Sequence, residues 1–151
     1  MEKIAVLELL DARDVQLGFR ANSVVDAIPL LLRPALARRV DDATAQAIID
    51  AAIKRESEGA TMCGALVLPH ARTSAVNDFV LTVAANPQGV IAGQAEPRIM
   101  FAFVSPASKR QEHLNLLAAL ARLSQNPGVV RQVVEATTSG RVIEILRGAG
   151  I

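Results

Sequence analysis

The chain has 151 residues, of which 51% are hydrophobic and 3% aromatic, and its formal net charge at pH 7 is +1. A chain of this length is predicted to form a single domain, residues 1–151, with a core large enough to need no disulfide. The scattered arginines and scarce aromatic residues provide neither a basic surface nor a stacking platform, so we expect no binding to nucleic acid.

The single cysteine, Cys63, rules out an internal disulfide and a cysteine-based zinc site. No hydrophobic run approaches the ~20 residues that span a bilayer, so we expect no membrane insertion. The N-terminal stretch is soon interrupted by Asp11, Arg13 and Asp14, which is not the pattern of a secretion signal. We therefore expect a cytoplasmic protein that holds neither a metal nor a cofactor.

The first predicted elements are a strand and a long helix. Residues 15–19 alternate hydrophobic and polar side chains, which is typical of a strand with one face in water. Asn22-Ser23 offers an N-cap for a helix over 24–40. Pro29 and Pro34 lie within this helix, and because each lacks an N–H and crowds the preceding turn, we expect a helix that is kinked or in two pieces.

A second helix is predicted between Asp41 and Gly59. Acidic residues at its start suit the positive end of the helix dipole, and a glycine is a common helix stop. Its buried stripe is expected to comprise Ala47, Ile48, Ala51, Ala52 and Ile53. A short buried strand follows at 65–68 and ends at Pro69, so that His70 is expected to lie where this strand leaves the sheet.

The second half of the chain begins with hydrophobic strands. Residues 79–84 predict a strand closed by a turn at 86–89, after which residues 90–91 predict the start of a short edge strand. Residues 98–104 form the most hydrophobic run and predict a central strand.

Three helices are predicted at the C-terminal end. Ser108 and Gln111 form a capping-box pattern at the start of the first helix. Its buried face is expected to hold Leu114, Leu117, Ala118 and Ala121. Residues 126–128 break this helix, valines from 129 to 134 line a short second one, and Ser139 is expected to cap the last.

Helices lie between several consecutive predicted strands. The sequence therefore predicts an α/β fold, a single domain with a mixed central β-sheet flanked by helices on both faces.

Three side chains are expected to meet at the strand ends, where open α/β sheets bind ligands. His70 follows one strand, His113 lies in the first turn of the helix after residue 104, and Arg55 lies at the end of the helix before the His70 strand. Free N–H groups at a helix N-terminus suit an anion such as phosphate. The same dipole disfavours a charged imidazole, so we expect His113 to be neutral at pH 7.

This arrangement suits transfer of a phosphoryl group to an imidazole nitrogen. A neutral histidine is nucleophilic at one nitrogen while the other donates its proton to a fixed acceptor. Under this hypothesis His70 is the nucleophile and His113 donates a hydrogen bond to the phosphoryl group. Arg55 or Arg72 neutralises the phosphoryl charge.

Each of these residues also has a purely structural interpretation. A histidine after a strand more often forms a structural hydrogen bond, and one in the first turn of a helix is more often a surface or capping residue. An arginine near a helix C-terminus, such as Arg55, is by default a solvated charge that matches the dipole. Cys63 is more often a small buried hydrophobic residue than a reactive thiol.

Arg55-Glu56, Thr61 and the run from Val67 to Arg72 resemble the signature of the type-2 enzyme IIA domain of the sugar phosphotransferase system. This is the fructose/mannitol class, which includes the nitrogen-regulatory IIA proteins. Val104-Ser105-Pro106 followed by Glu112-His113-Leu114 is similar to the family's late strand, proline and helix start. The resemblance extends over nearly the whole chain.

By this resemblance, His70 falls on the phosphorylated histidine, His113 on the second active-site histidine and Arg55 on the active-site arginine. It implies a phosphotransferase component that accepts phosphate from the histidine-containing phosphocarrier protein and passes it to a IIB domain. In the nitrogen branch, the domain instead regulates a partner, such as a kinase or transporter, according to its phosphorylation state.

The sequence departs from the family pattern around Thr61. The family's serine before this residue is Ala60 here, and the link from Thr61 to His70 is one residue shorter and has lost most of its glycines. Because glycines let backbone approach a phosphate closely, we expect this loss to narrow or reshape the pocket. The altered link favours an alternative hypothesis, a non-catalytic regulatory module on the same fold.

Overall fold

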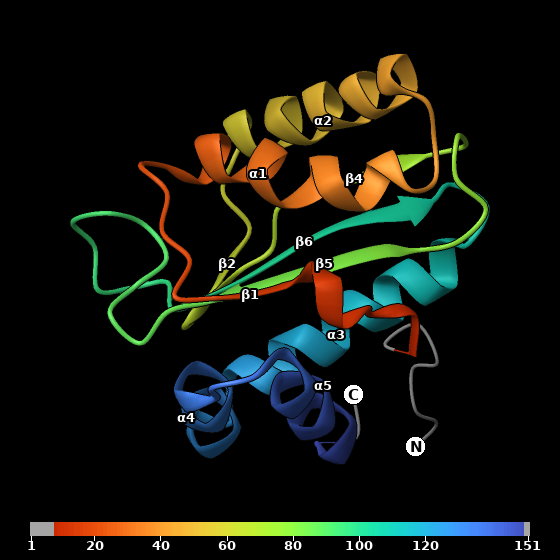
Figure 1. The fold of residues 1–151 in the computed structure, drawn as a ribbon. Coiled ribbons are helices and arrows are strands. Elements are labelled where there is room, and N and C mark those ends of the chain that lie inside the picture. The colour runs from red at the N-terminus through yellow and green to blue at the C-terminus, as the bar shows by residue number, and fades with distance from the viewer. Residues whose placement is uncertain (1–7, 150–151) are drawn as a thin grey trace.

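Residues 8–149, which the computed structural model describes, form a mixed sheet between two layers of helices (Figure 1). Helices α1 (Val24–Ala37) and α2 (Asp42–Ser57) cover one face of the sheet. Helices α3 (Arg110–Ser124), α4 (Pro127–Glu135) and α5 (Ser139–Gly148) cover the other face. The predicted α/β architecture is therefore confirmed.

The six strands follow a spatial order that differs from their order in the chain. This order is β1 (Val15–Leu17), β5 (Val80–Ala85), β6 (Ile99–Pro106), β3 (Leu66–Val67) and β2 (Met62–Cys63), and β4 (His70–Thr73) also pairs with β6. β5 and β6 are antiparallel, whereas β1 runs parallel to β5, and β3 and β4 run parallel to β6. Every residue of β5 and β6 is buried, so the predicted central strand is confirmed.

The short edge strand predicted at residues 90–91 is wrong. Ile91 forms only an isolated bridge with Ala21, and no strand begins at either residue. The turn predicted before it is confirmed by a hydrogen bond of 3.0 Å from the N–H of Gly89 to the carbonyl of Asn86.

β3 and β4 pair with the same strand, β6, and are separated by Leu68 and Pro69. Pro69 has no N–H to donate to the ladder, but its carbonyl accepts a hydrogen bond of 3.1 Å from the N–H of Phe103. Pairing with β6 therefore resumes after the proline. The prediction that His70 lies where a strand leaves the sheet is wrong, since His70 is the first residue of β4 and pairs with Phe103.

Side chains along β6 alternate between two hydrophobic cores. Ile99, Phe101 and Phe103 pack on the side of α3, α4 and α5, whereas Met100, Ala102 and Val104 pack on the side of α1 and α2. Ser105 continues the first series, and the His70 ring stacks on Phe103. This alternation puts His70 on the face of the sheet that α3 covers.

Helix α1 is continuous although it contains Pro29 and Pro34, so the two-piece alternative is wrong. Each proline leaves the carbonyl four residues earlier without its helical donor. These carbonyls belong to Val25, which is half-buried, and Leu30, which is exposed, so neither residue lies in the core. Ser23 caps the helix as predicted, and its Oγ accepts a hydrogen bond of 3.0 Å from the N–H of Asp26.

Helix α2 begins after Asp41, as predicted, because the Asp41 carboxylate accepts a hydrogen bond of 2.7 Å from the N–H of Thr44. The predicted buried stripe is right at Ile48 and Ala52 but wrong at Ala47 and Ala51, which are exposed. The buried residues are Ala45, Ile48, Ile49, Ala52 and Glu56.

Helix α3 differs most from its prediction. It has no side-chain cap, so the capping box expected from Ser108 and Gln111 is absent. Leu114 and Ala118 are exposed, and the buried residues are His113, Leu116, Ala119, Leu120 and Leu123. Every residue from 116 to 121 is hydrophobic, so spacing alone does not decide which side of the helix faces the sheet.

The last two helices begin close to their predicted positions. Pro127 is the first residue of α4, and Asn126 caps it by accepting a hydrogen bond of 3.2 Å from the N–H of Val129. α5 is capped by Thr138 rather than by Ser139, which is its first residue.

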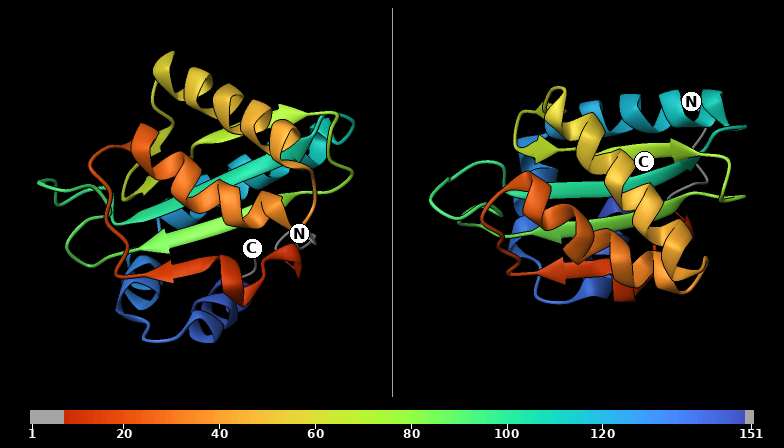
Figure 2. Two further views of the ribbon diagram at one scale, coloured as in Figure 1. Left: turned by 45° about the horizontal axis from the view of Figure 1, so that its top comes forward. Right: turned by 90° about the horizontal axis from the view of Figure 1, so that it is seen from above.

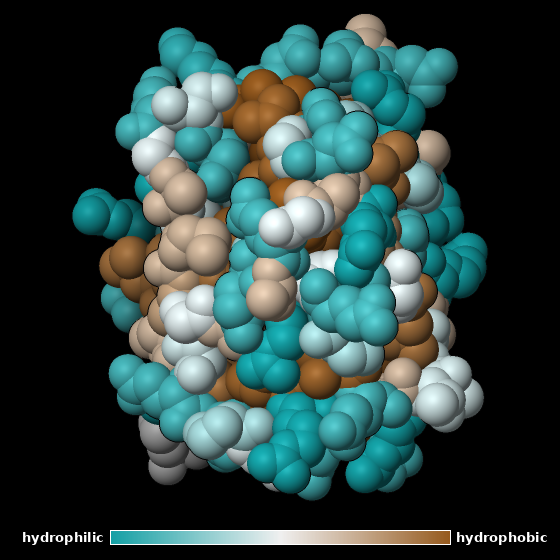
Figure 3. Space-filling view, turned by 90° about the vertical axis from the view of Figure 1, so that its left-hand side faces the viewer, coloured by the Kyte–Doolittle hydropathy of each residue, from teal (hydrophilic) through white to brown (hydrophobic). Residues whose placement is uncertain are grey.

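Figure 2 shows α1 and α2 lying next to each other across one face of the sheet. The loop between β5 and β6 projects on the left of Figure 1, and Figure 3 shows the molecule from that end. Hydrophilic residues predominate on this end, and hydrophobic ones are visible only in separate areas.

Within residues 8–149, no helix has the length and hydrophobicity needed to cross a membrane.

Candidate active site

The His70 ring is held by the backbone that separates β3 from β4. Its Nδ1 lies 2.7 Å from the carbonyl oxygen of Leu68. Because a carbonyl only accepts, Nδ1 carries the proton, and Nε2 of the neutral ring has a lone pair. His70 is 8% exposed, and its ring stacks on Phe103 with centroids 4.9 Å apart and planes within 10°. The ring therefore has a fixed orientation and a fixed tautomer.

Thr61 also forms a hydrogen bond with the Leu68 carbonyl. Its Oγ1 donates to the Leu68 oxygen at 2.7 Å, and the N–H of Leu68 donates to the carbonyl of Thr61 at 3.0 Å. Thr61 and His70 thus share one acceptor, which couples the orientation of the histidine to the loop after α2. Burial raises the pKa of Glu56, near the end of α2.

His113 lies in the first turn of α3, as predicted, but it is 6% exposed and faces the sheet. Its ring centroid is 5.3 Å from that of His70 and 6.0 Å from that of Phe103. Its Nδ1 lies 2.6 Å from Oγ of Ser105, near the end of β6. The interpretation of His113 as a surface residue is therefore wrong.

The pKa values of both histidines are lowered, so both rings are neutral at pH 7. Burial lowers the pKa of His70, and the positive charge of Arg55 acts in the same direction, against the hydrogen bond to Leu68. Burial also lowers the pKa of His113 to about 4, with smaller contributions from His70 and Arg72. This lowered pKa agrees with the expected neutrality of His113, and burial is its main cause.

Two exposed arginines belong to the elements around the histidine pair. Arg72 lies two residues after His70 in β4 and so shares its face of the sheet, and its Nη2 donates to the carbonyl of Ala107 at 3.1 Å. Arg55 lies in the last turn of α2, where its Nη1 donates to the carbonyl of Gly59 at 3.0 Å. Because a guanidinium has five N–H donors, each arginine retains donors for an anion.

The structure brings His70 and His113 together, as the sequence predicts, whereas Arg55 is linked to this pair only by its effect on the pKa of His70. The structure also adds groups that the prediction lacks. These are the Leu68 carbonyl, the Phe103 ring and the Ser105 hydroxyl. A backbone carbonyl leaves no signal in a sequence. Ser105 does leave one, because alternation along a strand extended to Pro106 puts this polar residue on the same face as Phe103.

The shortened link between Thr61 and His70 forms a hairpin away from the histidines. Gly64 and Ala65 join β2 to β3, and Gly64 adopts a φ of +59°, which suits glycine. A Cβ at Gly64 would lie 3.6 Å from Ser124, the last residue of α3. Ser124 is about 16 Å from His113 along the helix axis. Gly64, the glycine that remains in the link, therefore provides the left-handed backbone conformation of the turn between β2 and β3.

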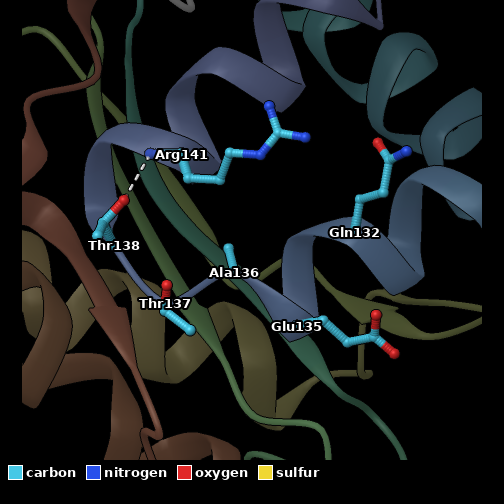
Figure 4. Close-up of a pocket in the computed structure, with 6 residues that line it drawn as sticks. All are labelled: Gln132, Glu135, Ala136, Thr137, Thr138 and Arg141. Carbon is cyan, nitrogen blue, oxygen red and sulfur yellow. Dashed lines mark hydrogen bonds between the residues drawn. The ribbon is translucent and has the colours of Figure 1, made fainter.

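A surface hollow of about 490 Å³ lies elsewhere, between the end of α4 and the start of α5 (Figure 4). Its lining residues are Gln132, Glu135, Ala136, Thr137, Thr138 and Arg141, all exposed except Ala136. It therefore lacks the enclosed polar groups of a ligand site. No cluster of three His, Cys, Asp or Glu side chains suited to a metal ion occurs in the described part of the chain.

Comparison with known proteins identifies similar sequences. Residues 8–149 match the family model described as "Phosphoenolpyruvate-dependent sugar phosphotransferase system, EIIA 2". The chain is 32% identical over 125 residues to the "PTS system fructose-specific EIIA component" of Haloferax volcanii, covering 80% of each protein.

Two solved structures show a similar fold. Nitrogen regulatory protein IIA-Ntr from Neisseria meningitidis superimposes with a TM-score of 0.74 at 21% identity, covering 93% of this chain and 98% of that one. Enzyme IIA mannitol from Escherichia coli, in complex with phosphorylated enzyme IIB mannitol, superimposes with a TM-score of 0.73 at 17% identity, covering 92% and 97%. At these identities the likeness is one of fold.

Proposed function

The chain belongs to the EIIA 2 family of the phosphoenolpyruvate-dependent sugar phosphotransferase system, and on this premise we propose that it is a phosphohistidine carrier. In this proposal His70 accepts a phosphoryl group from the histidine-containing phosphocarrier protein and passes it to a IIB domain. The fructose-specific relative supports a role in sugar uptake. The solved complex of a mannitol IIA with a phosphorylated IIB supports a IIB domain as the partner.

The hydrogen bond between Nδ1 of His70 and the Leu68 carbonyl is the observation that carries this proposal. It leaves the lone pair of Nε2 to attack phosphorus. A bond from Nε2 to phosphorus forms as the bond from phosphorus to the donor's ring nitrogen breaks, and the donor, protonated on its other nitrogen, leaves as neutral imidazole. His70 keeps its Nδ1 proton, so the phosphorylated ring is positively charged and binds the Leu68 carbonyl more strongly.

The surrounding side chains supply the charge that phosphoryl transfer requires. A phosphoryl group brings close to two negative charges to the site. Arg55 and Arg72 are the cations whose charges act on the histidine pair, and we assign them the neutralisation of the phosphoryl oxygens. His113 lies 5.3 Å from His70 between ring centroids, and we assign it the role of hydrogen-bond donor to the same group.

A signalling output is the second candidate function. Leu114, the neighbour of His113, is a large hydrophobic residue with 46% exposure, which suits contact with a partner protein. A kinase or transporter bound there would respond to the charge on His70, because phosphorylation changes the local charge by close to two units.

Intact-mass measurement of the purified protein tests the carrier proposal. The protein is incubated at neutral pH with phosphoenolpyruvate, enzyme I and the phosphocarrier protein. We expect one acid-labile phosphoryl adduct, which is absent in His70→Ala and present in His113→Ala, whose onward transfer to a IIB domain is slower. An adduct formed at the wild-type rate in His70→Ala would show that another residue is the acceptor. No adduct in any variant would favour the non-catalytic module.

A further inference from the structure

The Ser105 hydroxyl is a fully buried polar group with no role in the proposed phosphoryl transfer. It is 0% exposed, and Nδ1 of His113, at 2.6 Å, is its hydrogen-bond partner. Among residues 8–149, His113 is the only hydrogen-bond partner of this hydroxyl, and no other acceptor is found for its hydrogen. A serine hydroxyl has one hydrogen to donate, and burial without an acceptor for it is costly.

The direction of this hydrogen bond decides the tautomer of His113. If Nδ1–H donated to Ser105, the buried hydroxyl hydrogen would have no acceptor. If the hydroxyl donates to Nδ1, both groups are satisfied, and the single proton of the neutral ring lies on Nε2. Burial lowers the pKa of His113 to about 4, so the ring holds only one proton at pH 7.

We propose that Ser105 is a positioning residue that fixes His113 as the Nε2–H tautomer, so that His113 donates a hydrogen bond to a phosphoryl group on His70. The two buried histidines then hold opposite tautomers, since the Leu68 carbonyl fixes the proton of His70 on Nδ1. One ring offers a lone pair at Nε2 and the other offers an N–H at Nε2. The hydrogen bond from His113 to the phosphoryl group rests on the proposed phosphocarrier function, but the tautomer of His113 does not depend on that function.

The wrong tautomer would oppose the reaction. With the proton on Nδ1, His113 would present the lone pair of Nε2 to the phosphoryl oxygens, and the two would repel each other. Loss of a hydrogen bond to a charged group slows a step by roughly tenfold or more. Ser105 therefore controls the rate through the ring of His113 without touching the phosphoryl group.

The tautomer is measured first, on the unphosphorylated wild-type protein at pH 7. Two-bond proton–nitrogen correlation spectra of the ¹⁵N-histidine protein are expected to show Nε2 protonated and Nδ1 unprotonated in His113, and the reverse in His70. Protonated Nδ1 in His113 would overturn the proposal. This measurement needs no variant and no phosphoryl donor, so it stays decisive even if the carrier function is absent.

The rate is measured next, with variants of Ser105. Phosphoryl acceptance is expected to slow roughly tenfold in Ser105→Ala, with loss of the Nε2–H pattern of His113, and to recover in Ser105→Thr, which keeps the hydroxyl. Thr82→Val is the matched control, because Thr82 carries an equally buried hydroxyl that donates to the Ala102 carbonyl at 2.7 Å. Wild-type transfer in Ser105→Ala, or equal slowing in Thr82→Val, would contradict the proposal.

Discussion

His70 and His113 are the same type of residue in opposite hydrogen-bonding environments. Nδ1 of His70 contacts a carbonyl oxygen, which only accepts, whereas Nδ1 of His113 contacts a hydroxyl, which also donates. Both rings are buried, so each holds one proton at pH 7, and the partner atom determines which nitrogen carries it. At the scale of the residue, the proposed roles of His70 as nucleophile and His113 as donor differ because of one carbonyl and one hydroxyl.

Burial of His113 makes the free energy of unfolding depend on pH. Its pKa is about 4 in the folded protein and 6.5 without perturbation, so the unfolded chain binds the proton more readily. The contribution of the neutral His113 ring to stability is therefore present above pH 6.5 and is lost as the pH falls from 6.5 towards 4. Between pH 7 and pH 5 we expect a loss of about 2 kcal/mol from this residue.

Urea unfolding of the wild type and of His113→Gln at pH 7 and pH 5 measures this contribution. His70, also with a lowered pKa, is common to both proteins, so the difference between the two pH dependences reports on His113. Equal pH dependence in the two proteins would contradict the account of a buried, neutral His113.

The titratable candidates could be found from the sequence, but the hydrogen-bond acceptor of His70 and the contact between the two rings could not. His70 and His113 are the only two histidines in the chain, and their strand and helix positions mark them. The acceptor of His70 is a backbone carbonyl, which every residue has, so nothing in the sequence distinguishes Leu68. Contact between the two rings depends on which face of α3 turns to the sheet, and that face was wrongly predicted.

At the scale of the elements, breaks in regular structure determine where side chains lie. Between β3 and β4, the carbonyl of Pro69 faces β6, whereas the N–H and the carbonyl of Leu68 face Thr61, so the Leu68 carbonyl accepts from both His70 and Thr61. The strands β5 and β6 were predictable because each is a continuous hydrophobic run. α2 and α3 were predictable as helices but not in their buried faces, since alanine- and leucine-rich segments offer more than one hydrophobic stripe.

Glycine at position 89 is required by the loop between β5 and β6. Gly89 has a φ of +101°, and a Cβ there would lie 2.0 Å from the carbonyl oxygen of Gln94. Gly93 in the same loop has a φ of +79° with no atom within 4 Å of a Cβ. We expect Gly93→Ala to lower the free energy of unfolding by about 1 kcal/mol, from the backbone alone. Gly89→Ala is expected to lower it by about 3 kcal/mol, because the clash with the backbone adds to the strain.

Chemical denaturation of the two glycine variants checks this difference. Gly93→Ala serves as the matched control, since it shares the loop and the left-handed φ but lacks the clash. Equal unfolding free energies for the two variants would show that the loop relaxes around a Cβ at position 89.

At the scale of the whole molecule, the layered fold brings distant segments to one site. β4 supplies His70, β6 supplies Phe103 and Ser105, and α3 supplies His113, all on one face of the sheet. Arg55 belongs to α2, which covers the opposite face, and its charge contributes to the lowered pKa of His70. The α/β class was predictable from the alternation of elements, whereas the position of β4 beside β6 required the three-dimensional structure.

We propose that this arrangement makes Nε2 of His70 the phosphoryl acceptor. The most direct measurement is phosphorus–nitrogen coupling in the NMR spectrum of the phosphorylated, ¹⁵N-histidine protein. We predict that phosphorus couples to Nε2 of His70 and that Nδ1 of the same ring keeps its proton. Coupling to Nδ1 of His70, or to either nitrogen of His113, would contradict the account.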